Sequence, residues 1–151
     1  MRYEPRDYQR DASTEILKRL RRARRDWAED RDRTSFALSA ITGSGKTVIA
    51  TAVIEALFHG TTDLGAERDP KVAFLWITDD PALNRQTKAR MLDASELLNN
   101  WQLREVDEAF PDASLAPGHV YFLNTQKLSR TSRLTQGGTN AREFSLSLIH
   151  I

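Results

Sequence analysis

The sequence has no cysteine, few histidines and no long apolar run, and each absence removes a class of function. Without cysteine the chain forms no disulfides and no thiolate metal sites, which suits a reducing cytoplasm. Its 3 histidines are not clustered with other ligands, which argues against a zinc site. No apolar run approaches the roughly 20 residues that cross a bilayer, and the N-terminus has no apolar signal core. We therefore expect a cytoplasmic protein without membrane segments.

Charge and length set further bounds. The formal net charge is +1, so composition by itself does not indicate nucleic-acid binding, and such a function has to be argued from motifs. The 151 residues are enough for one domain with a hydrophobic core.

The most informative stretch of the chain is residues 40–47, Ala-Ile-Thr-Gly-Ser-Gly-Lys-Thr. Gly43 and Gly45 allow the backbone to curl so that successive N–H groups face one concavity, where they can hold phosphate oxygens. Lys46 can reach the β- and γ-phosphates, and the Thr47 hydroxyl can coordinate a bridging magnesium ion. A glycine turn that binds nothing is the alternative. The residue types favour a phosphate-binding loop for a nucleoside triphosphate.

The flanking residues predict a strand, a loop and a helix in that order. Residues 36–40 are a short, largely apolar run that is typical of a buried strand. A helix is predicted at about residues 46–58, because apolar residues recur there at helical spacing: Val48, Ile49, Ala52, Val53, Ala56 and Leu57. The positive end of that helix and its first amides would add to the anion site.

The form Ala-x-Thr-Gly-Ser-Gly-Lys-Thr resembles motif I of the superfamily-two helicases, the DEAD/DEAH-box and restriction-subunit class. The general pattern has glycine where this chain has Ala40, whereas alanine is ordinary there in these helicases. The resemblance implies an α/β fold of the P-loop NTPase class, with a RecA-like parallel sheet flanked by helices, and ATP and Mg²⁺ as ligands. It assigns ATP binding to Thr42, Gly43, Ser44, Gly45, Lys46 and Thr47, with Lys46 as the catalytic residue and Thr47 as the magnesium ligand.

The N-terminal region carries a second element of the same family. A helix is predicted at about residues 5–27, because apolar residues recur every three or four positions. Arg6, Tyr8, Gln9 and Ala12 resemble the glutamine motif that precedes motif I in many superfamily-two proteins. By that resemblance Arg6 and Gln9 would bind ATP and Gln9 would read adenine, since an amide can both donate and accept. A solvent-facing glutamine is the alternative.

The same helix carries a run of basic residues from Lys18 to Arg25. A DNA-binding stripe is one interpretation. Because the arginines lie opposite the apolar stripe and acidic residues follow from Asp26 onward, we favour a solvated helix face.

Residues 71–78 are the most strand-like run in the chain and, being apolar on both faces, predict a central buried strand. Asp80 and Pro81 then predict the start of a helix, as its N-cap and its first residue. The buried side of this helix and its continuation is expected at Leu83, Thr87, Met91, Ser95, Leu97 and Leu98.

Thr78 followed by Leu83-x-x-Gln86 resembles motif Ia of these helicases, which grips the phosphodiester backbone of the bound strand. Ile77 stands where proline is usual. The resemblance assigns nucleic-acid contacts to Thr78, Arg85 and Gln86, whose side chains suit phosphate contacts that position a strand. Exposed helix residues without that role are the alternative.

Two further strands are predicted, a short one at residues 100–106 and a buried one at residues 119–124. Asn124, Thr125 and Gln126, at the end of the second, resemble the Thr-x-Gln-type element that touches nucleic acid in the type III restriction subunits. That subfamily implies DNA, contacted through its backbone, and a modification methyltransferase subunit as partners. His119 is interpreted as structural.

We expect residues 1–34 to form the glutamine-motif helix and residues 35–128 an incomplete helicase ATP-binding domain of the same lobe. The sequence has no Asp-Glu-Ala-His or Asp-Glu-Ala-Asp box; residues 79–80 are the only competitor, and the second lobe with its arginine is also missing. Residues 129–145 predict a flexible segment. Residues 146–151 match a translated transposon end used for sequencing libraries and predict a non-native tail; an ordinary short strand is the alternative.

The sequence therefore predicts part of the first lobe of an ATP-dependent DNA helicase or translocase, an ATP hydrolase in the intact parent and inactive as this chain alone. Two other classes stay open. One is another P-loop ATPase or kinase that acts on a small molecule, which would lack an adenine-reading glutamine ahead of the loop. The other is an inactive ATP-binding module that docks partners.

Overall fold

The structure, a computed structural model, describes residues 1–2, 4–107, 110 and 114–128. The chain divides into two compact units, one formed by Met1–Asp69 with Asp93–Leu97 and the other by Pro70–Leu92 with Leu98–Ile151. The expected flexible segment 129–145 and tail 146–151 lie outside the described residues. In the part of the chain that is described, no helix has the length and apolar character needed to cross a bilayer.

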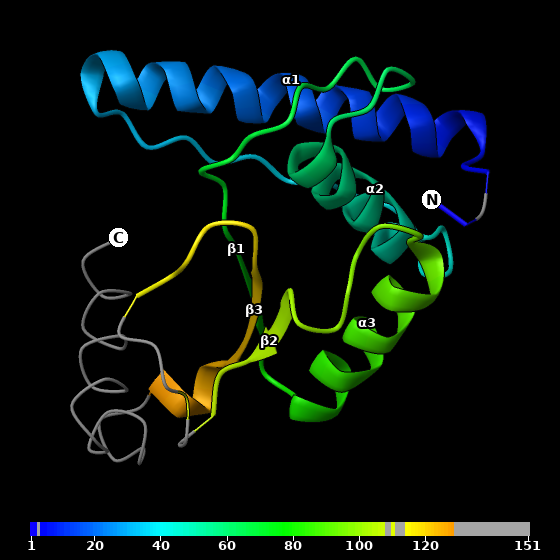
Figure 1. Cartoon of the computed structure of the whole chain (residues 1–151), viewed down its shortest axis with the longest axis vertical. Helices are drawn as coiled ribbons and strands as arrows, with labels where there is room; N and C mark the ends of the chain where they lie inside the picture. The colour runs from blue at the N-terminus through cyan, green and yellow to red at the C-terminus, as the bar shows by residue number, and fades with distance from the viewer. Residues whose placement is uncertain (3, 108–109, 111–113, 129–151) are drawn as a thin grey trace. The chain divides into compact units, whose positions relative to one another are not determined.

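The first unit is built on two helices that pack against each other, α1 (Asp7–Asp30) and α2 (Lys46–His59), drawn in blue and teal in Figure 1. In α1 the buried residues Gln9, Ser13 and Leu17 are four positions apart, so one stripe faces inward and the rest is solvated. By contrast, α2 is buried at Ile49 and throughout residues 51–58, as expected of a helix that is apolar nearly all round. Both predicted helices are thus confirmed.

The loop after α2 is held against α1. Gly60 has a φ of 78° and its N–H donates to the Ala56 carbonyl at 2.8 Å, so it is the C-cap of α2. Farther on, Arg24 forms an ion pair with Asp69 and Arg21 donates to the Gly65 carbonyl. The basic face of α1 is exposed, as predicted, and two of its arginines also anchor this loop.

The predicted strand at residues 36–40 is wrong. Residues 31–41 have no regular secondary structure, and the Leu38 side chain is 39% exposed. A strand forms only where a neighbour completes its ladder of N–H and C=O groups, and among the described residues no strand pairs with this segment. Its apolar composition alone therefore does not produce a strand.

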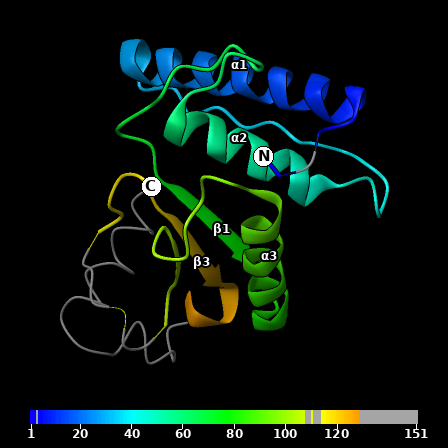
Figure 2. The same cartoon turned by 45° about the vertical axis from the view of Figure 1, so that its right-hand side comes forward.

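The second unit contains a three-stranded parallel sheet, order β1-β3-β2, which confirms the expected α/β class with a parallel sheet. Its strands are β1 (Phe74–Thr78), β2 (Leu103–Glu105) and β3 (Val120–Asn124), and Figure 2 shows β1 and β3 side by side. In register, Val120 lies between Phe74 and Leu103. All three strands were predicted, with longer bounds.

The position of β1 in this sheet differs from the prediction. The run was expected to be central and buried, but β1 is an edge strand and its Ile77 is 48% exposed. The central strand is β3, whose five residues are all buried. Apolar residues on both faces indicate a strand that packs on both sides, and they do not tell which strand has two neighbours.

The helix that follows β1 is α3 (Pro81–Ala94), and the Ala82 N–H donates to the Asp80 carboxylate at 2.7 Å, which confirms the predicted N-cap. The buried side agrees with the prediction at Met91, which is fully buried, and beyond the helix at Ser95 and Leu98. It differs at Leu97, which is 45% exposed, and in the first turn. There Leu83 is 46% exposed and Asn84 is only 5% exposed. A polar side chain therefore takes the inward position nearest to the end of β1.

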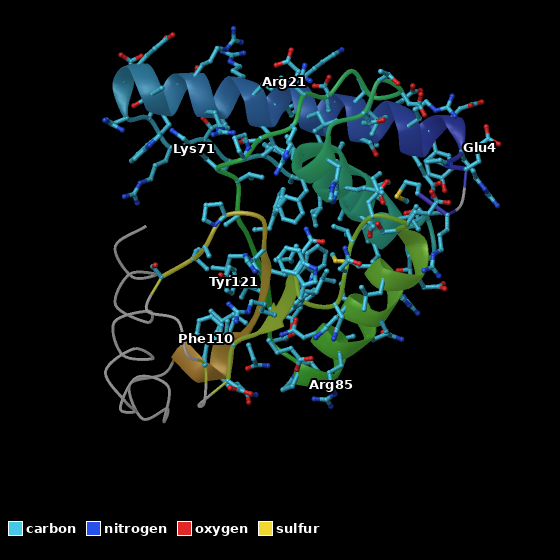
Figure 3. The ribbon with its side chains drawn as sticks, in the orientation of Figure 1. Glu4, Arg21, Lys71, Arg85, Phe110 and Tyr121 are labelled. Carbon is cyan, nitrogen blue, oxygen red and sulfur yellow. The ribbon has the colours of Figure 1, made fainter. Side chains whose placement is uncertain are left out.

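A small aromatic cluster closes the core of this unit. The rings of Phe110 and Tyr121 meet edge to face, with centroids 5.6 Å apart (Figure 3), and Val106 and Leu123 complete the buried group. The Tyr121 hydroxyl accepts a hydrogen bond from the Ala116 N–H at 2.9 Å. This packing fixes β3 from its amino end to its carboxyl end.

Candidate functional site

The predicted phosphate-binding loop forms a tight turn directly before α2. Gly43 and Gly45 have φ values of 85° and 82°, in the left-handed region that glycine adopts without strain. The Ser44 N–H donates to the Ile41 carbonyl at 3.2 Å and closes the turn. Gly45 is the N-cap of α2, and no side chain caps the first amides of this helix. The turn therefore presents a helix N-terminus whose amides are suited to an anion.

Lys46 is the exposed cation of this turn. Its Nζ donates to the carbonyls of Ala40 and Ile41, at 2.8 and 3.0 Å. Both acceptors belong to the loop itself, so the ammonium group is held over the turn by weak neutral partners. Phosphate oxygens would be stronger acceptors, because their negative charge attracts the ammonium group more strongly than the dipole of a neutral carbonyl does.

Two side chains of α1 also contact the turn, both at the Ser44 carbonyl. The Tyr8 hydroxyl donates to the Ser44 carbonyl at 2.8 Å, and Gln9 Nε2 donates to the same oxygen at 3.2 Å. Gln9 Oε1 accepts from the Arg6 N–H at 3.0 Å, so the glutamine is held at both ends of its amide. The glutamine motif and the phosphate loop thus meet in one unit.

Close packing explains why the second glycine of the turn is glycine. A Cβ atom at Gly45 would overlap Gln9 Nε2, whereas a Cβ atom at Gly43 would meet nothing within 4 Å. Gln9 is 9% exposed and fills the space beside Gly45. A side chain at position 45 would therefore push the Gln9 amide away from its place beside the turn.

The residues of the turn fit a magnesium-bound triphosphate. Ser44 Oγ is buried and has no hydrogen-bond partner among the described residues, so a polar atom stands inside the turn without an acceptor or a donor. Thr47, the predicted metal ligand, is half-buried and lies in the first turn of α2. Thr42 is exposed at the entrance of the turn. Of the described residues, no cluster of histidine and acidic side chains forms a separate metal site.

The predicted nucleic-acid residues gather at the carboxyl edge of the sheet in the second unit. Thr78 ends β1, and Thr125 and Gln126 are exposed in the short 3-10 helix η1 (Thr125–Leu128) that follows β3. Arg85 and Gln86 are exposed in the first turns of α3, and Figure 3 shows Arg85 projecting from that helix. The structure thus brings these exposed side chains to one edge.

Asn124 differs from the rest of this group because it is buried. It is 3% exposed, its Nδ2 donates to the Asp79 carbonyl at 2.9 Å, and its Oδ1 accepts from the Gln126 N–H at 2.8 Å. Both polar atoms of the side chain are engaged with protein backbone. Asn124 therefore contacts the turn after β1 and does not face solvent.

Sequence reasoning missed two residues of these sites. Tyr8 was counted in the glutamine motif without a role, although its hydroxyl holds the phosphate turn. Asn84, in the first turn of α3, was not considered, although its Oδ1 lies 2.9 Å from Thr78 Oγ1. A small polar residue one turn from a strand end was the available signal for Asn84.

Comparison with known protein families identifies the family of this chain. A family model described as the type III restriction enzyme, res subunit, matches residues 2–149 of the chain. Searches of the curated proteins and of the solved structures gave no match. The matched range includes the phosphate turn, the glutamine motif and the carboxyl edge of the sheet.

Proposed function

Because the chain belongs to the family of the type III restriction enzyme res subunit and is a P-loop helicase domain, we propose that it is the ATP-binding part of an ATP-dependent DNA helicase or translocase. One observation supports this most directly. The turn at residues 43–47 opens α2 with two left-handed glycines and a lysine, and is held from behind by Gln9. The same arrangement suits ATP better than a smaller anion, because it places the Gln9 side-chain amide, the proposed adenine reader, beside the phosphate site.

Each residue of the turn has a distinct task in this proposal. Lys46 exchanges the carbonyls of Ala40 and Ile41 for the β- and γ-phosphates and stabilises charge that develops there. The Ser44 hydroxyl would bind the phosphates, and the Thr47 hydroxyl would coordinate the magnesium ion. Bound MgATP supplies the transferable phosphoryl group. Binding thus replaces loop contacts by stronger charged ones.

Gln9 can recognise the base without leaving the turn. Its NH₂ group has two hydrogens, of which one is used by the Ser44 carbonyl, and its carbonyl oxygen has a second lone pair beside the one used by the Arg6 N–H. One donor and one acceptor remain, which is the pair that the N6 and N7 edge of adenine requires. Arg6 is exposed next to it and completes the proposed ATP-binding set.

The carboxyl edge of the sheet is the proposed DNA site. Thr78, Arg85, Gln86, Thr125 and Gln126 offer hydroxyl, guanidinium and amide groups, which hold a phosphodiester backbone without reading its sequence. A modification methyltransferase subunit is the protein partner that the family implies for the intact enzyme.

The base preference tests the role of Gln9. Gln9→Ala is expected to lower the affinity for ATP about tenfold more than the affinity for GTP, because adenine loses a bonded pair that guanine does not form, whereas the lost contact with the Ser44 carbonyl affects both nucleotides. Competition of ATP and GTP against a fluorescent ATP analogue measures both. Glu29→Ala, an exposed change on the same helix, is the control. An unchanged ATP preference in Gln9→Ala would show that Gln9 does not read the base.

The chain by itself is expected to bind MgATP and to hydrolyse it no faster with single-stranded DNA than without. The physical reason is that residues 1–151 contain no Asp-Glu-Ala-His or Asp-Glu-Ala-Asp box to activate the attacking water. Phosphate release by the purified chain, with and without an oligothymidylate, measures this. Hydrolysis that is faster with DNA than without it would contradict this prediction.

A further inference from the structure

Two asparagines are buried at the carboxyl edge of the sheet, where the proposed DNA contacts are exposed. Asn84 is 5% exposed and Asn124 is 3% exposed. A buried amide is retained at little cost only when its donor and acceptor are both bonded, so each of these side chains has to be accounted for by its partners. The partners lie in the two turns that follow β1 and β3.

Asn124 links these two turns. It stands at the end of β3, and its Nδ2 reaches across to the Asp79 carbonyl in the turn after β1, at 2.9 Å. Its Oδ1 accepts from the Gln126 N–H in η1, at 2.8 Å, which fixes the turn after β3. One buried amide therefore holds two segments that are 45 residues apart along the chain.

Asn84 holds the first of these turns from its other side. Thr78 Oγ1 lies 2.9 Å from the Asp80 carbonyl and 2.9 Å from the Asn84 side-chain amide. Both partners are acceptor oxygens, the Asp80 carbonyl and Asn84 Oδ1, so the single hydrogen of the Thr78 hydroxyl is donated toward the two of them. Residues 78–80 are thus fixed between α3 and β3.

We propose that Asn124 is a positioning residue for DNA binding, which joins the turn after β1 and the turn after β3 into one backbone-binding surface. The proposal rests on the proposed function, because the surface that Asn124 organises is the proposed DNA site. Asn124 affects DNA binding by positioning Thr78, Arg85 and Gln126, and it makes no contact of its own with DNA. Phosphate contacts from both turns then form together or not at all.

The first test is a double-mutant cycle on the whole chain, read by binding of a fluorescent oligothymidylate. Asn124→Ala is expected to weaken binding about tenfold, the factor that corresponds to one lost buried hydrogen bond. In that background Arg85→Ala is expected to cost less than it costs in the wild-type chain, because Arg85 is already misplaced. Additive effects would show that Asn124 touches DNA independently, and unchanged binding would show that the link is unimportant; either result overturns the proposal.

A matched control and a second ligand separate positioning from loss of folding. Asn100→Ala makes the same change at an exposed asparagine of the same unit and is expected to leave DNA affinity unaltered. MgATP affinity is expected to stay unaltered in Asn124→Ala, whereas a variant that unfolds loses both ligands. The slope of the logarithm of DNA affinity against the logarithm of salt concentration is expected to become shallower, since fewer phosphates are contacted.

Amide hydrogen exchange tests the link without DNA. In Asn124→Ala the amides of Gln126, Ala82 and Asn84 are all expected to exchange faster, because both turns lose their common support. Faster exchange at Gln126 alone would show two independent turns and overturn the proposal. If the wild-type chain binds no oligothymidylate, the proposed DNA function fails, and the exchange pattern still decides whether Asn124 joins the turns.

Discussion

Replacing Lys46 by alanine is expected to lower the affinity of the chain for MgATP by about a hundredfold. The lysine supplies the cation of the phosphate turn, and two charge-assisted hydrogen bonds to phosphate are together worth about 3 kcal/mol, which corresponds to that factor. Stability is expected to change little, because Lys46 is exposed and its present partners are two loop carbonyls. Isothermal titration calorimetry with MgATP measures the first quantity, and urea unfolding measures the second.

Lys18→Ala is the control for this experiment, because Lys18 is an exposed lysine of α1 and the substitution removes the same charge. Its MgATP affinity is expected to equal that of the wild-type chain. If Lys46→Ala binds MgATP as tightly as Lys18→Ala does, the nucleotide is held elsewhere, and the domain is a docking module and not a phosphate-transfer site.

The second large effect is expected at Gly45. Gly45→Ala places a side chain at a φ of 82° and into Gln9 Nε2, so it adds backbone strain and displaces the glutamine from the Ser44 carbonyl. We expect the free energy of unfolding to fall by about 2–4 kcal/mol, from the strain of a left-handed residue together with a lost buried hydrogen bond. Urea unfolding followed by circular dichroism measures the change.

Gly43→Ala separates these two contributions, because Gly43 has nearly the same φ and open space around its Cβ position. Its expected cost is about 1–2 kcal/mol, the strain alone. In addition, Gln9→Ala is expected to cost less in the Gly45→Ala background than in the wild-type chain, because the contact is already broken. Equal costs for Gly43→Ala and Gly45→Ala would show that α1 does not pack on the turn as the structure has it.

The parts of the fold that depend on local sequence could be predicted. The glycines, the lysine and the apolar spacing after it define the turn and α2, and Asp80 with Pro81 defines the start of α3. Gly60 ends α2 for an equally local reason, since it adopts a φ of 78°. In each case the bonded groups are within about four residues of one another, so the pattern in the sequence is also the pattern of contacts.

The parts that depend on distant partners could not be predicted in this way. Residues 36–40 have the composition of a strand, but a strand also needs a neighbour, and apolar spacing carries no information about one. The edge position of β1 has the same cause, because only the pairing order makes β3 the central strand. Apolar composition therefore shows neither whether a strand finds a neighbour nor which place it takes in the sheet.

The candidate sites follow the same division. Motif comparison found Gln9 and Lys46, whereas the role of Tyr8 depends on a hydrogen bond to a residue 36 positions away. Asn124 was assigned a direct contact with DNA because of its place in a motif. Its burial and its bond to the Asp79 carbonyl give it a different proposed role, that of joining two turns.

A structure of the chain with Mg²⁺ and a non-hydrolysable ATP analogue tests the central claim most directly. We predict that the phosphates lie in the turn at residues 43–47. Lys46 Nζ is expected to have moved from the carbonyls of Ala40 and Ile41 to phosphate oxygens, and Thr47 to coordinate the metal. An analogue bound away from this turn, or a Lys46 that still donates to Ala40 and Ile41 with the analogue bound, would contradict it.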